Sequence, residues 1–384
     1  MPKELQEDMT RSDPSPWRGA GRPAFLSFQA AGAPLAVTLA SDALIVTARD
    51  AVAAALTVTR AGPGAVLAGT LPETGVAPAD AIVAACEALF GAEPDLAYAD
   101  LGMALDGTLA GHLLAAGIAT AEDGGLRVSP DLLWQQPRPW LAGKGGVGGG
   151  AYPQRLVLEN GIRHPLRPPM REGLLYARFI PWLGQTLSFH TADPDRHLAP
   201  FHRWMNDPRV AEIWEETGEE AQHRAYLEER RADPHAVPVI GCFDDVPFGY
   251  FELYWAKENR LGPHYEAQDY DRGWHVLVGE DAYRGKAYIT AWLPSLMHFM
   301  FLDDPRTQRI VGEPKATHAQ QIRNLDRSGF AKVKHVDFAH KRALLVMLLR
   351  ERFFGDRLWQ PAAEVPALVP AGAGEPPAVR AASA

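Results

Sequence analysis

The stretch 274–279, Trp-His-Val-Leu-Val-Gly, and the turn 283–287, Tyr-Arg-Gly-Lys-Ala, decide the fold that we expect for the second half of this chain. The first segment is an apolar strand that carries one imidazole. The second is a glycine turn leading into a helix. The first N–H groups of a helix lack partners within it, and its N-terminal end is the positive end of the helix dipole. With Arg284 and Lys286 beside those amides, the turn is predicted to hold a pyrophosphate.

Apolar periodicity predicts alternating strands and helices on both sides of this stretch. We expect helices at 219–231, 287–302 and 318–328, and one at 200–216 that Asp207-Pro208 interrupts. The expected strands are 186–190, 237–243, 249–255, 274–279, 309–312, 332–338 and 343–349. This order predicts a mixed α/β fold for residues 186–360.

The first half of the chain, residues 24–150, forms a separate domain in our interpretation. It is rich in Ala, with strands predicted at 43–47 and 65–68 and a helix at 78–90, and it shows no cluster of His, Cys or acids. The glycine-rich run 141–150 lacks the residue order of a phosphate-binding P-loop and suits a flexible connection. We therefore expect a linker at 151–185, and poorly ordered tails at 1–23 and 361–384.

Composition excludes several classes of protein. The 384 residues are 47% hydrophobic and 22% charged, which is enough for two globular cores. A net charge of -9 and a pI of about 5.8 argue against a nucleic-acid-binding protein. Cys86 and Cys242 have no second Cys or His at metal-ligand spacing, so we expect neither a metal site nor a disulfide. The absence of a signal sequence or long apolar run predicts a cytoplasmic protein without a membrane partner.

Five phrases carry a resemblance to a known family. They are FHRWMNDPRV at 201–210, GYFELYW at 249–255, DRGWH at 271–275, VGEP at 311–314 and HKRA at 340–343. In this order they resemble the GNAT superfamily of acyl-CoA-dependent N-acetyltransferases over about residues 186–358. More specifically they resemble the branch that acylates N-hydroxylated lysine or ornithine in hydroxamate siderophore biosynthesis. Aerobactin-type acetyltransferases, the mycobactin lysine acyltransferase and fungal hydroxyornithine acyltransferases belong to that branch.

The resemblance implies how acetyl-CoA, or another acyl-CoA, would bind. The strand of His275 would separate from the strand 309–312, and the thioester would enter between them. The implied acyl-CoA-binding residues are Val276, Leu277 and Val278 for the pantetheine, Arg284, Gly285, Lys286 and Ala287 for the pyrophosphate, and His318. The chain departs from the family pattern at Ala282 in the loop, at His318 in place of Asn, and at Leu325 in place of the Tyr that protonates the thiolate. No general acid is thus assigned.

The resemblance also implies that His275 and Glu313 are catalytic and serve the incoming nitrogen. An imidazole that titrates near neutral pH suits removal of a proton from an attacking nitrogen, although a lone His on a strand is often structural.

Tyr250, Glu252 and Tyr254 share one face of their strand. That face either lines the substrate site, with Glu252 recognising an α-ammonium group, or is solvated. Trp204 and Asn206 are further candidates for substrate binding, with a core position and a turn cap as their structural alternatives.

The sequence therefore predicts acyl transfer, most simply of acetyl, to the N-hydroxyamine of N5-hydroxyornithine or N6-hydroxylysine. An aminoglycoside-type N-acetyltransferase is an alternative, because residues 258–271 are acidic. A non-catalytic acyl-CoA-binding protein is another, because of the three departures from the family pattern. By analogy with larger members of the branch, the first half is a degenerate copy of the same fold or a homodimerisation module.

Overall fold

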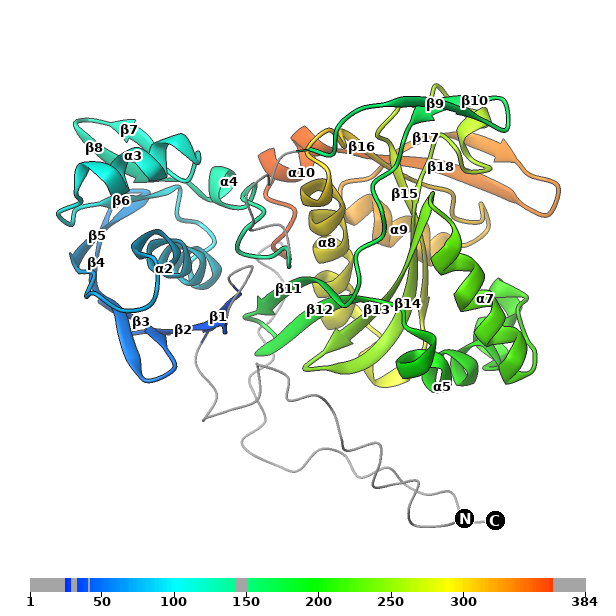
Figure 1. The fold of residues 1–384 in the computed structure, drawn as a ribbon, viewed down its shortest axis with the longest axis horizontal. Coiled ribbons are helices and arrows are strands. Elements are labelled where there is room, and N and C mark those ends of the chain that lie inside the picture. Colours follow the sequence, from blue (N-terminus) through cyan, green and yellow to red (C-terminus); the bar gives the residue numbers. More distant parts are fainter. Residues whose placement is uncertain (1–24, 29–32, 41, 143–150, 362–384) are drawn as a thin grey trace, which may run out of the picture.

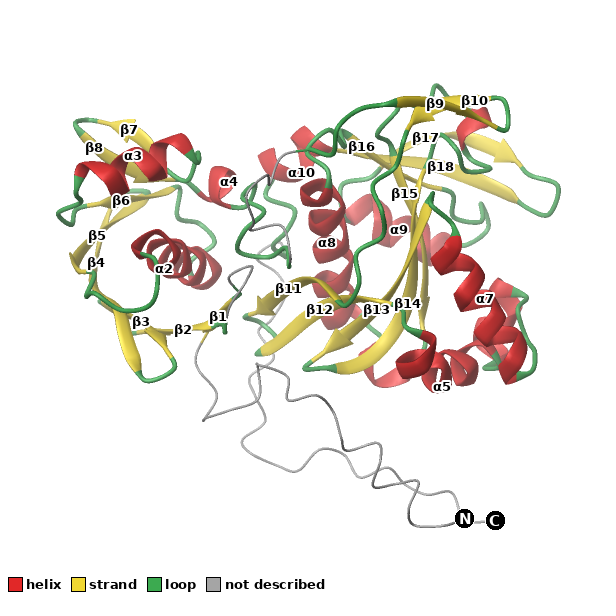
Figure 2. Cartoon of the chain, in the orientation of Figure 1, coloured by secondary structure: helices red, strands yellow, loops and turns green. Residues whose placement is uncertain are grey.

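A computed structural model describes residues 25–28, 33–40, 42–142 and 151–361. The described residues do not include the expected tail 1–23. They also leave out residues 362–384 of the other expected tail and residues 143–150 of the glycine-rich run. The described chain forms two eight-stranded sheets, each with helices, and a small separate hairpin (Figure 1). Figure 2 shows the mixture of helices and strands in both units, which confirms the expected mixed α/β class.

The first sheet has the strand order β1-β2-β3-β4-β5-β6-β8-β7. Only β5 and β6 pair in parallel, and the helix α2 (Pro78–Ala92) connects them. The other helices of this unit are α3 (Gly107–Ala115) and α4 (Pro130–Leu133). The strands are β1 (Phe25–Ser27), β2 (Leu35–Leu39), β3 (Ala43–Ala48), β4 (Ala51–Ala61), β5 (Gly64–Thr70), β6 (Tyr98–Leu101), β7 (Thr120–Glu122) and β8 (Gly125–Val128).

The second sheet repeats this plan with the order β11-β12-β13-β14-β15-β16-β18-β17. Only β15 and β16 are parallel, connected by α8 (Lys286–Asp303). Its strands are β11 (Leu174–Ile180), β12 (Gln185–Thr191), β13 (Ala236–Phe243), β14 (Val246–Trp255), β15 (Arg272–Val278), β16 (Arg309–Gly312), β17 (Ala331–Asp337) and β18 (Arg342–Leu349). Its other helices are α5 (Pro194–Met205), α6 (Pro208–Trp214), α7 (Glu220–Ala232), α9 (Ala319–Arg327) and α10 (Arg350–Gly355).

The two sheets match in strand order and in the place of the parallel pair, as expected if the first unit is a degenerate copy of the second. They differ in two respects. The helices α5, α6 and α7 lie between β12 and β13, whereas β2 and β3 are neighbours in the chain. The parallel pair of the first sheet runs from Gly64↔Tyr98 to Leu67↔Leu101, whereas that of the second consists of Arg272↔Ile310 and Gly273↔Val311.

The expected linker 151–185 contains regular structure. Its first part is the hairpin of β9 (Leu156–Glu159) and β10 (Ile162–Pro165), and its last part is β11, the edge strand of the second sheet. The apolar run of β11 is buried, so the second unit begins before the expected boundary. The helix expected from residue 200 begins earlier, at Pro194, because Asp193 caps the amide of Asp195.

The two units pack against each other through one apolar core. The ring of Phe25 in the first sheet packs edge to face against the ring of Phe179 in the second sheet, with centroids 5.1 Å apart. The indole of Trp134 stacks on that of Trp359 at 5.2 Å. A buried carboxylate, Glu87 of α2, accepts hydrogen bonds from Ser27 and from Trp140, and burial raises its pKa to about 7. In the described part of the chain, no helix is both long and apolar enough to cross a bilayer.

Candidate active site

His275 and Glu252 lie directly opposite each other on the neighbouring strands β15 and β14. The cross-strand register places their side chains on the same face of the sheet, where Nδ1 of the imidazole is 3.0 Å from Oε2 of the carboxylate. Tyr250 and Tyr254 alternate with Glu252 along β14 and are buried. The shared face of β14 is therefore an interior polar layer, which excludes the solvated alternative.

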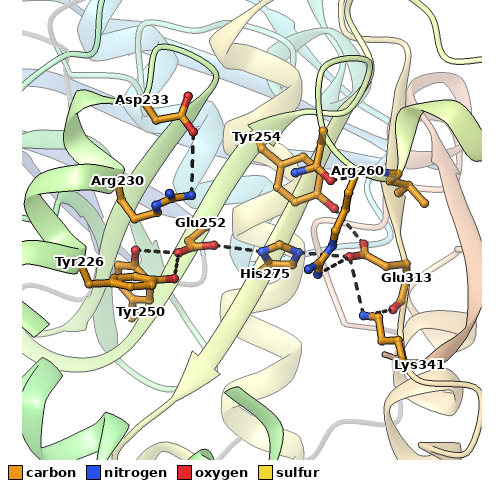
Figure 3. Close-up of polar contacts among 12 residues, drawn as sticks. Tyr226, Arg230, Asp233, Tyr250, Glu252, Tyr254, Arg260, His275, Glu313 and Lys341 are labelled. Carbon is orange, nitrogen blue, oxygen red and sulfur yellow. Dashed lines mark hydrogen bonds and ion pairs between the residues drawn. The ribbon is translucent and has the colours of Figure 1, made fainter. Parts of the chain in front are cut away.

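Glu313 approaches the same imidazole from the other side (Figure 3). It follows β16, and its Oε1 lies 3.2 Å from Nε2 of His275. The hydroxyl of Tyr254 donates to its Oε2 at 2.9 Å, and Arg260 donates to Oε1 at 3.3 Å. The ammonium of Lys341 donates to the main-chain oxygen of Glu313 at 3.0 Å. The side chain of Glu313 is only 2% exposed, so these partners replace the water that it would otherwise bind.

The two carboxylates change the protonation of His275. Burial by itself would lower the pKa of the imidazole, but the hydrogen bonds and charges of Glu252 and Glu313 outweigh burial and raise the pKa to about 9. For both carboxylates burial acts to raise the pKa, and the hydrogen bond and charge of His275 lower it below the usual range. At neutral pH the site is thus an imidazolium between two carboxylates. The expectation that His275 titrates near neutral pH is corrected accordingly.

Glu252 is fully engaged by the protein. Tyr226 of α7 donates to its Oε1 at 2.6 Å and Tyr250 donates at 3.1 Å, while the other oxygen faces His275. Its carboxylate therefore organises the imidazole, and its expected contact with a substrate ammonium stays a prediction. Sequence reasoning missed Tyr226 and Arg260 as members of this network, because helix and loop residues reach it only through tertiary folding.

Among the described residues, one edge of the strand that carries His275 has no strand partner beyond Gly273. Its pairing with β16 ends at Gly273↔Val311, whereas its pairing with β14 continues to Val278. Val276 and Val278 are half-buried, and Leu277 is buried in the core on the α5–α7 side of the sheet. β15 and β16 thus separate after Gly273, as expected if the thioester enters between them. The carbonyl of Val278, however, accepts a hydrogen bond from Arg209 at 3.1 Å and is occupied.

The predicted pyrophosphate turn forms the start of α8. Gly285 is its N-cap residue, with φ of 100°, and no side chain caps the helix, which begins at Lys286 with Ala287 following. A positive φ of this size favours glycine. Arg284, half exposed, pairs with Asp281 at 3.2 Å, and Lys286 is exposed. The amides at this end and both cations are thus available to an anion.

The remaining candidates lie outside the His275 network. His318 is the exposed N-cap of α9, and its Nδ1 is 2.9 Å from Oε1 of Gln321. Trp204 is buried beneath Gly279 and donates to Glu280 at 2.8 Å, so it supports the turn after β15. Asn206 donates to the carbonyl of Gly218 at 3.0 Å and accepts from its amide at 3.1 Å. Both side chains thus have partners within the protein, and their contact with a substrate stays a prediction.

The second unit is similar to several known proteins. A family model described as an acetyltransferase (GNAT) domain matches residues 193–338. The chain is 43% identical over 222 residues to the N(6)-hydroxylysine O-acetyltransferase of Escherichia coli, covering 58% of this chain and 70% of that protein. It is 50% identical over 195 residues to the N(5)-hydroxyornithine:cis-anhydromevalonyl coenzyme A-N(5)-transacylase of Beauveria bassiana, covering 50% of this chain and 43% of that protein. A crystal structure of an uncharacterized Bacillus halodurans protein is 27% identical, covers 50% of this chain and 96% of its own, and has a TM-score of 0.46.

The second unit has the fold of the GNAT class of acetyltransferase domains. The chain belongs to the GNAT acetyltransferase family, in the branch of the hydroxyornithine and hydroxylysine acyltransferases. It spans less than half of the Beauveria relative, at 43% of that protein's length.

Proposed function

We propose that the protein transfers an acyl group from acyl-CoA to the side-chain nitrogen of N5-hydroxyornithine or N6-hydroxylysine. The product is a hydroxamate for siderophore biosynthesis, made in the cytoplasm. The observation that carries this proposal is the imidazolium of His275 between Glu252 and Glu313, beside the strand edge that β16 leaves free. The names of two relatives support the substrate class.

The acyl-CoA site is proposed at the start of α8. The free amides after Gly285 and the side chains of Arg284 and Lys286 offer hydrogen bonds and positive charge to a pyrophosphate. The open edge of β15 offers main-chain groups to the pantetheine amides at Val276 and Leu277. Acetyl-CoA is the simplest donor, while the name of the Beauveria relative contains a longer acyl-CoA.

The substrate nitrogen needs little activation. An ordinary side-chain amine has a pKa of about 10.4 and is mostly protonated at neutral pH. The hydroxyl group of an N-hydroxyamine withdraws electrons, so its nitrogen is less basic and keeps its lone pair. Attack on the thioester forms the N–C bond and then breaks the C–S bond, and positioning supplies much of the rate.

One proton must move from the nitrogen to the leaving sulfur. The attacking nitrogen becomes strongly acidic once it bonds to carbon, so a weakly basic group is sufficient to accept its proton. We propose that a carboxylate oxygen of Glu252 or Glu313 accepts this proton while the imidazolium of His275 gives one to the thiolate, after which the proton shifts from the carboxyl group to the imidazole and restores the network. The network then serves as the general acid for which Leu325, buried on α9, offers no hydroxyl group.

The atom that receives the acyl group can be tested directly. The name of the Escherichia relative refers to an O-acetyltransferase and that of the Beauveria relative to N(5) transfer. Transfer to nitrogen gives a hydroxamate that chelates Fe³⁺ and gives a coloured complex, whereas transfer to oxygen gives an ester. A colour assay with ferric ion and the NMR spectrum of the product distinguish the two.

A substrate panel tests the proposal as a whole. The purified chain and acetyl-CoA are incubated with hydroxyornithine, hydroxylysine, unmodified ornithine and lysine, and kanamycin, and thiol release is measured. We expect turnover with the N-hydroxy amino acids at a kcat/KM well above that for the unmodified amines. Turnover with kanamycin alone would indicate the aminoglycoside alternative. Acetyl-CoA binding without thiol release from any amine would indicate a non-catalytic protein.

The structure weakens the case for the aminoglycoside alternative. That alternative depended on the acidic stretch 258–271 as a site for polycations. Glu258 binds Arg167 through two bonds of 2.5 and 2.7 Å, and Asp271 binds Arg309 at 2.9 and 2.5 Å. These carboxylates are already neutralised within the protein.

A further inference from the structure

A second cluster of ionisable side chains lies where the β9–β10 hairpin meets the second sheet. Glu159 ends β9, His164 lies in β10, and His235 immediately precedes β13. Oε2 of Glu159 is 3.4 Å from Nε2 of His235 and 3.8 Å from Nε2 of His164. One ligand atom from each residue lies within 4.8 Å of the others, so three donors converge on one point.

The hydrogen bonds of His164 determine which of its nitrogens carries a proton. Its Nδ1 is 2.9 Å from the carbonyl of Pro165 and 3.1 Å from Oε1 of Glu258, and both oxygens can only accept. Nδ1 must therefore carry hydrogen, so Nε2, which lies on the side of Glu159, is the nitrogen of His164 that can bind a metal ion. A cation placed between this nitrogen and the carboxylate would be bound by both.

An outer carboxylate lies close to both imidazoles. Oε1 of Glu258 is 3.1 Å from Nδ1 of His164 and 3.5 Å from Nδ1 of His235, and Nδ1 of His235 is buried without a hydrogen-bond partner among the described residues. Arg167 fixes Glu258 from behind through two hydrogen bonds. A carboxylate on the far nitrogen of each histidine is the usual support of metal-binding imidazoles.

From this geometry we propose that Glu159, His164 and His235 bind one Zn²⁺ ion. In a tetrahedral site with bonds of about 2.0–2.1 Å, ligand atoms lie roughly 3.3–3.4 Å apart, so His235 and Glu159 already have the required spacing. Glu159 is 46% exposed, which leaves the fourth position to water. The ion fastens the hairpin to the second sheet. The sequence predicted no metal site because these ligands are far apart in the chain.

The test uses the full chain, stripped with a chelator and titrated with ZnCl₂ by calorimetry at pH 7.5. We expect one site per chain and a higher melting temperature with zinc. Glu159→Gln and His235→Gln should each weaken zinc binding by more than about tenfold, at least the loss caused by removing an outer-shell partner. The matched exposed controls Glu122→Gln and His335→Gln should bind zinc like the parent.

Three results would overturn the inference. One is the absence of zinc binding by the stripped chain. Another is unchanged affinity in Glu159→Gln and His235→Gln. The third is loss of zinc binding in His275→Gln, which would place the ion in the catalytic network. None of these measurements depends on acyl transfer, so the outcome is independent of the proposed reaction.

Discussion

Nε2 of His275 lies 3.2 Å from Oε1 of Glu313, and this contact spans the place where β15 and β16 stop pairing. The only parallel neighbours in the second sheet are thus connected by main-chain bonds at one end and by an ion pair further on. A ligand that enters between the strands meets the imidazolium of His275, whose positive charge is balanced by the carboxylates of Glu252 and Glu313. Such a site can move a proton while its net charge stays small.

Replacing His275 by Gln should lower kcat by about 100-fold or more, because proton transfer by a positioned side chain contributes about that much. Acyl-CoA affinity should persist, since the proposed pyrophosphate site lies at α8. Stopped assays of thiol release and calorimetry with CoA measure the two quantities. His112→Gln, an exposed histidine of the first unit, is the control. Unchanged turnover would remove His275 from the mechanism.

Replacing Glu313 by Gln should lower the pKa of His275 from about 9 toward its ordinary value, because one of two flanking negative charges is lost. The amide oxygen of Gln can still accept from Tyr254, which preserves the packing. NMR titration of the His275 ring protons measures the shift. An unchanged midpoint would show that Glu252 alone sets the protonation of the imidazole.

Stability should fall as pH rises from about 6.5 to about 9. The pKa of His275 is raised from 6.5 to about 9 on folding, so the folded state holds a proton that the unfolded state has lost in this window. The contribution is fully present below pH 6.5, disappears above about pH 9, and is on the order of 3 kcal/mol. Urea unfolding across this range measures it. The decline should be absent in His275→Gln, and an equal decline in that variant would refute this origin.

Reversing the charge at Arg284 to Glu should weaken CoA binding by about tenfold or more, since a pyrophosphate would lose a cation and meet an anion. Arg352→Glu on α10 is the matched control, because that arginine is about equally exposed at 49% against 50%. Calorimetric titration with CoA compares the two variants. Equal affinities would place the pyrophosphate elsewhere.

The substitution Gly279→Ala should lower the free energy of unfolding by about 1–3 kcal/mol. A Cβ at this position would lie 2.2 Å from Cγ of Trp204, whose buried indole cannot move aside. Gly107→Ala is the control, because no atom lies within 4 Å of the corresponding Cβ. Thermal unfolding of both variants checks the difference. A stable Gly279→Ala would show that Trp204 is less tightly held than the packing indicates.

The sequence predicted the second unit well because its elements are long and their patterns are strong. The expected strand at 309–312 coincides with β16, and the expected helix at 287–302 lies within α8. The first unit was harder to interpret, because its Ala-rich strands have little contrast between their two faces. Its likeness to the second unit lies in strand order and pairing, which no local pattern contains.

The candidate site could be predicted only in part. His275 and Glu313 were identified through the family resemblance, and the structure brings them together. The second carboxylate partner of His275 depends on cross-strand register, and a shift of one residue would have turned Glu252 to the opposite face. Tyr226 comes from α7 and reaches the network only through helix packing.

The apolar core shared by the two units has a practical consequence for working with this protein. The family match begins at residue 193, after β12, so it omits the first sheet and the first two strands of the second. A fragment that begins at that boundary would lose β11 and β12 and would expose the indole of Trp359, on which Trp134 now stacks. Such a fragment should aggregate, whereas the full chain should melt in a single cooperative step. The first half, although it contributes no residue to the His275 network, therefore covers apolar surface of the second half.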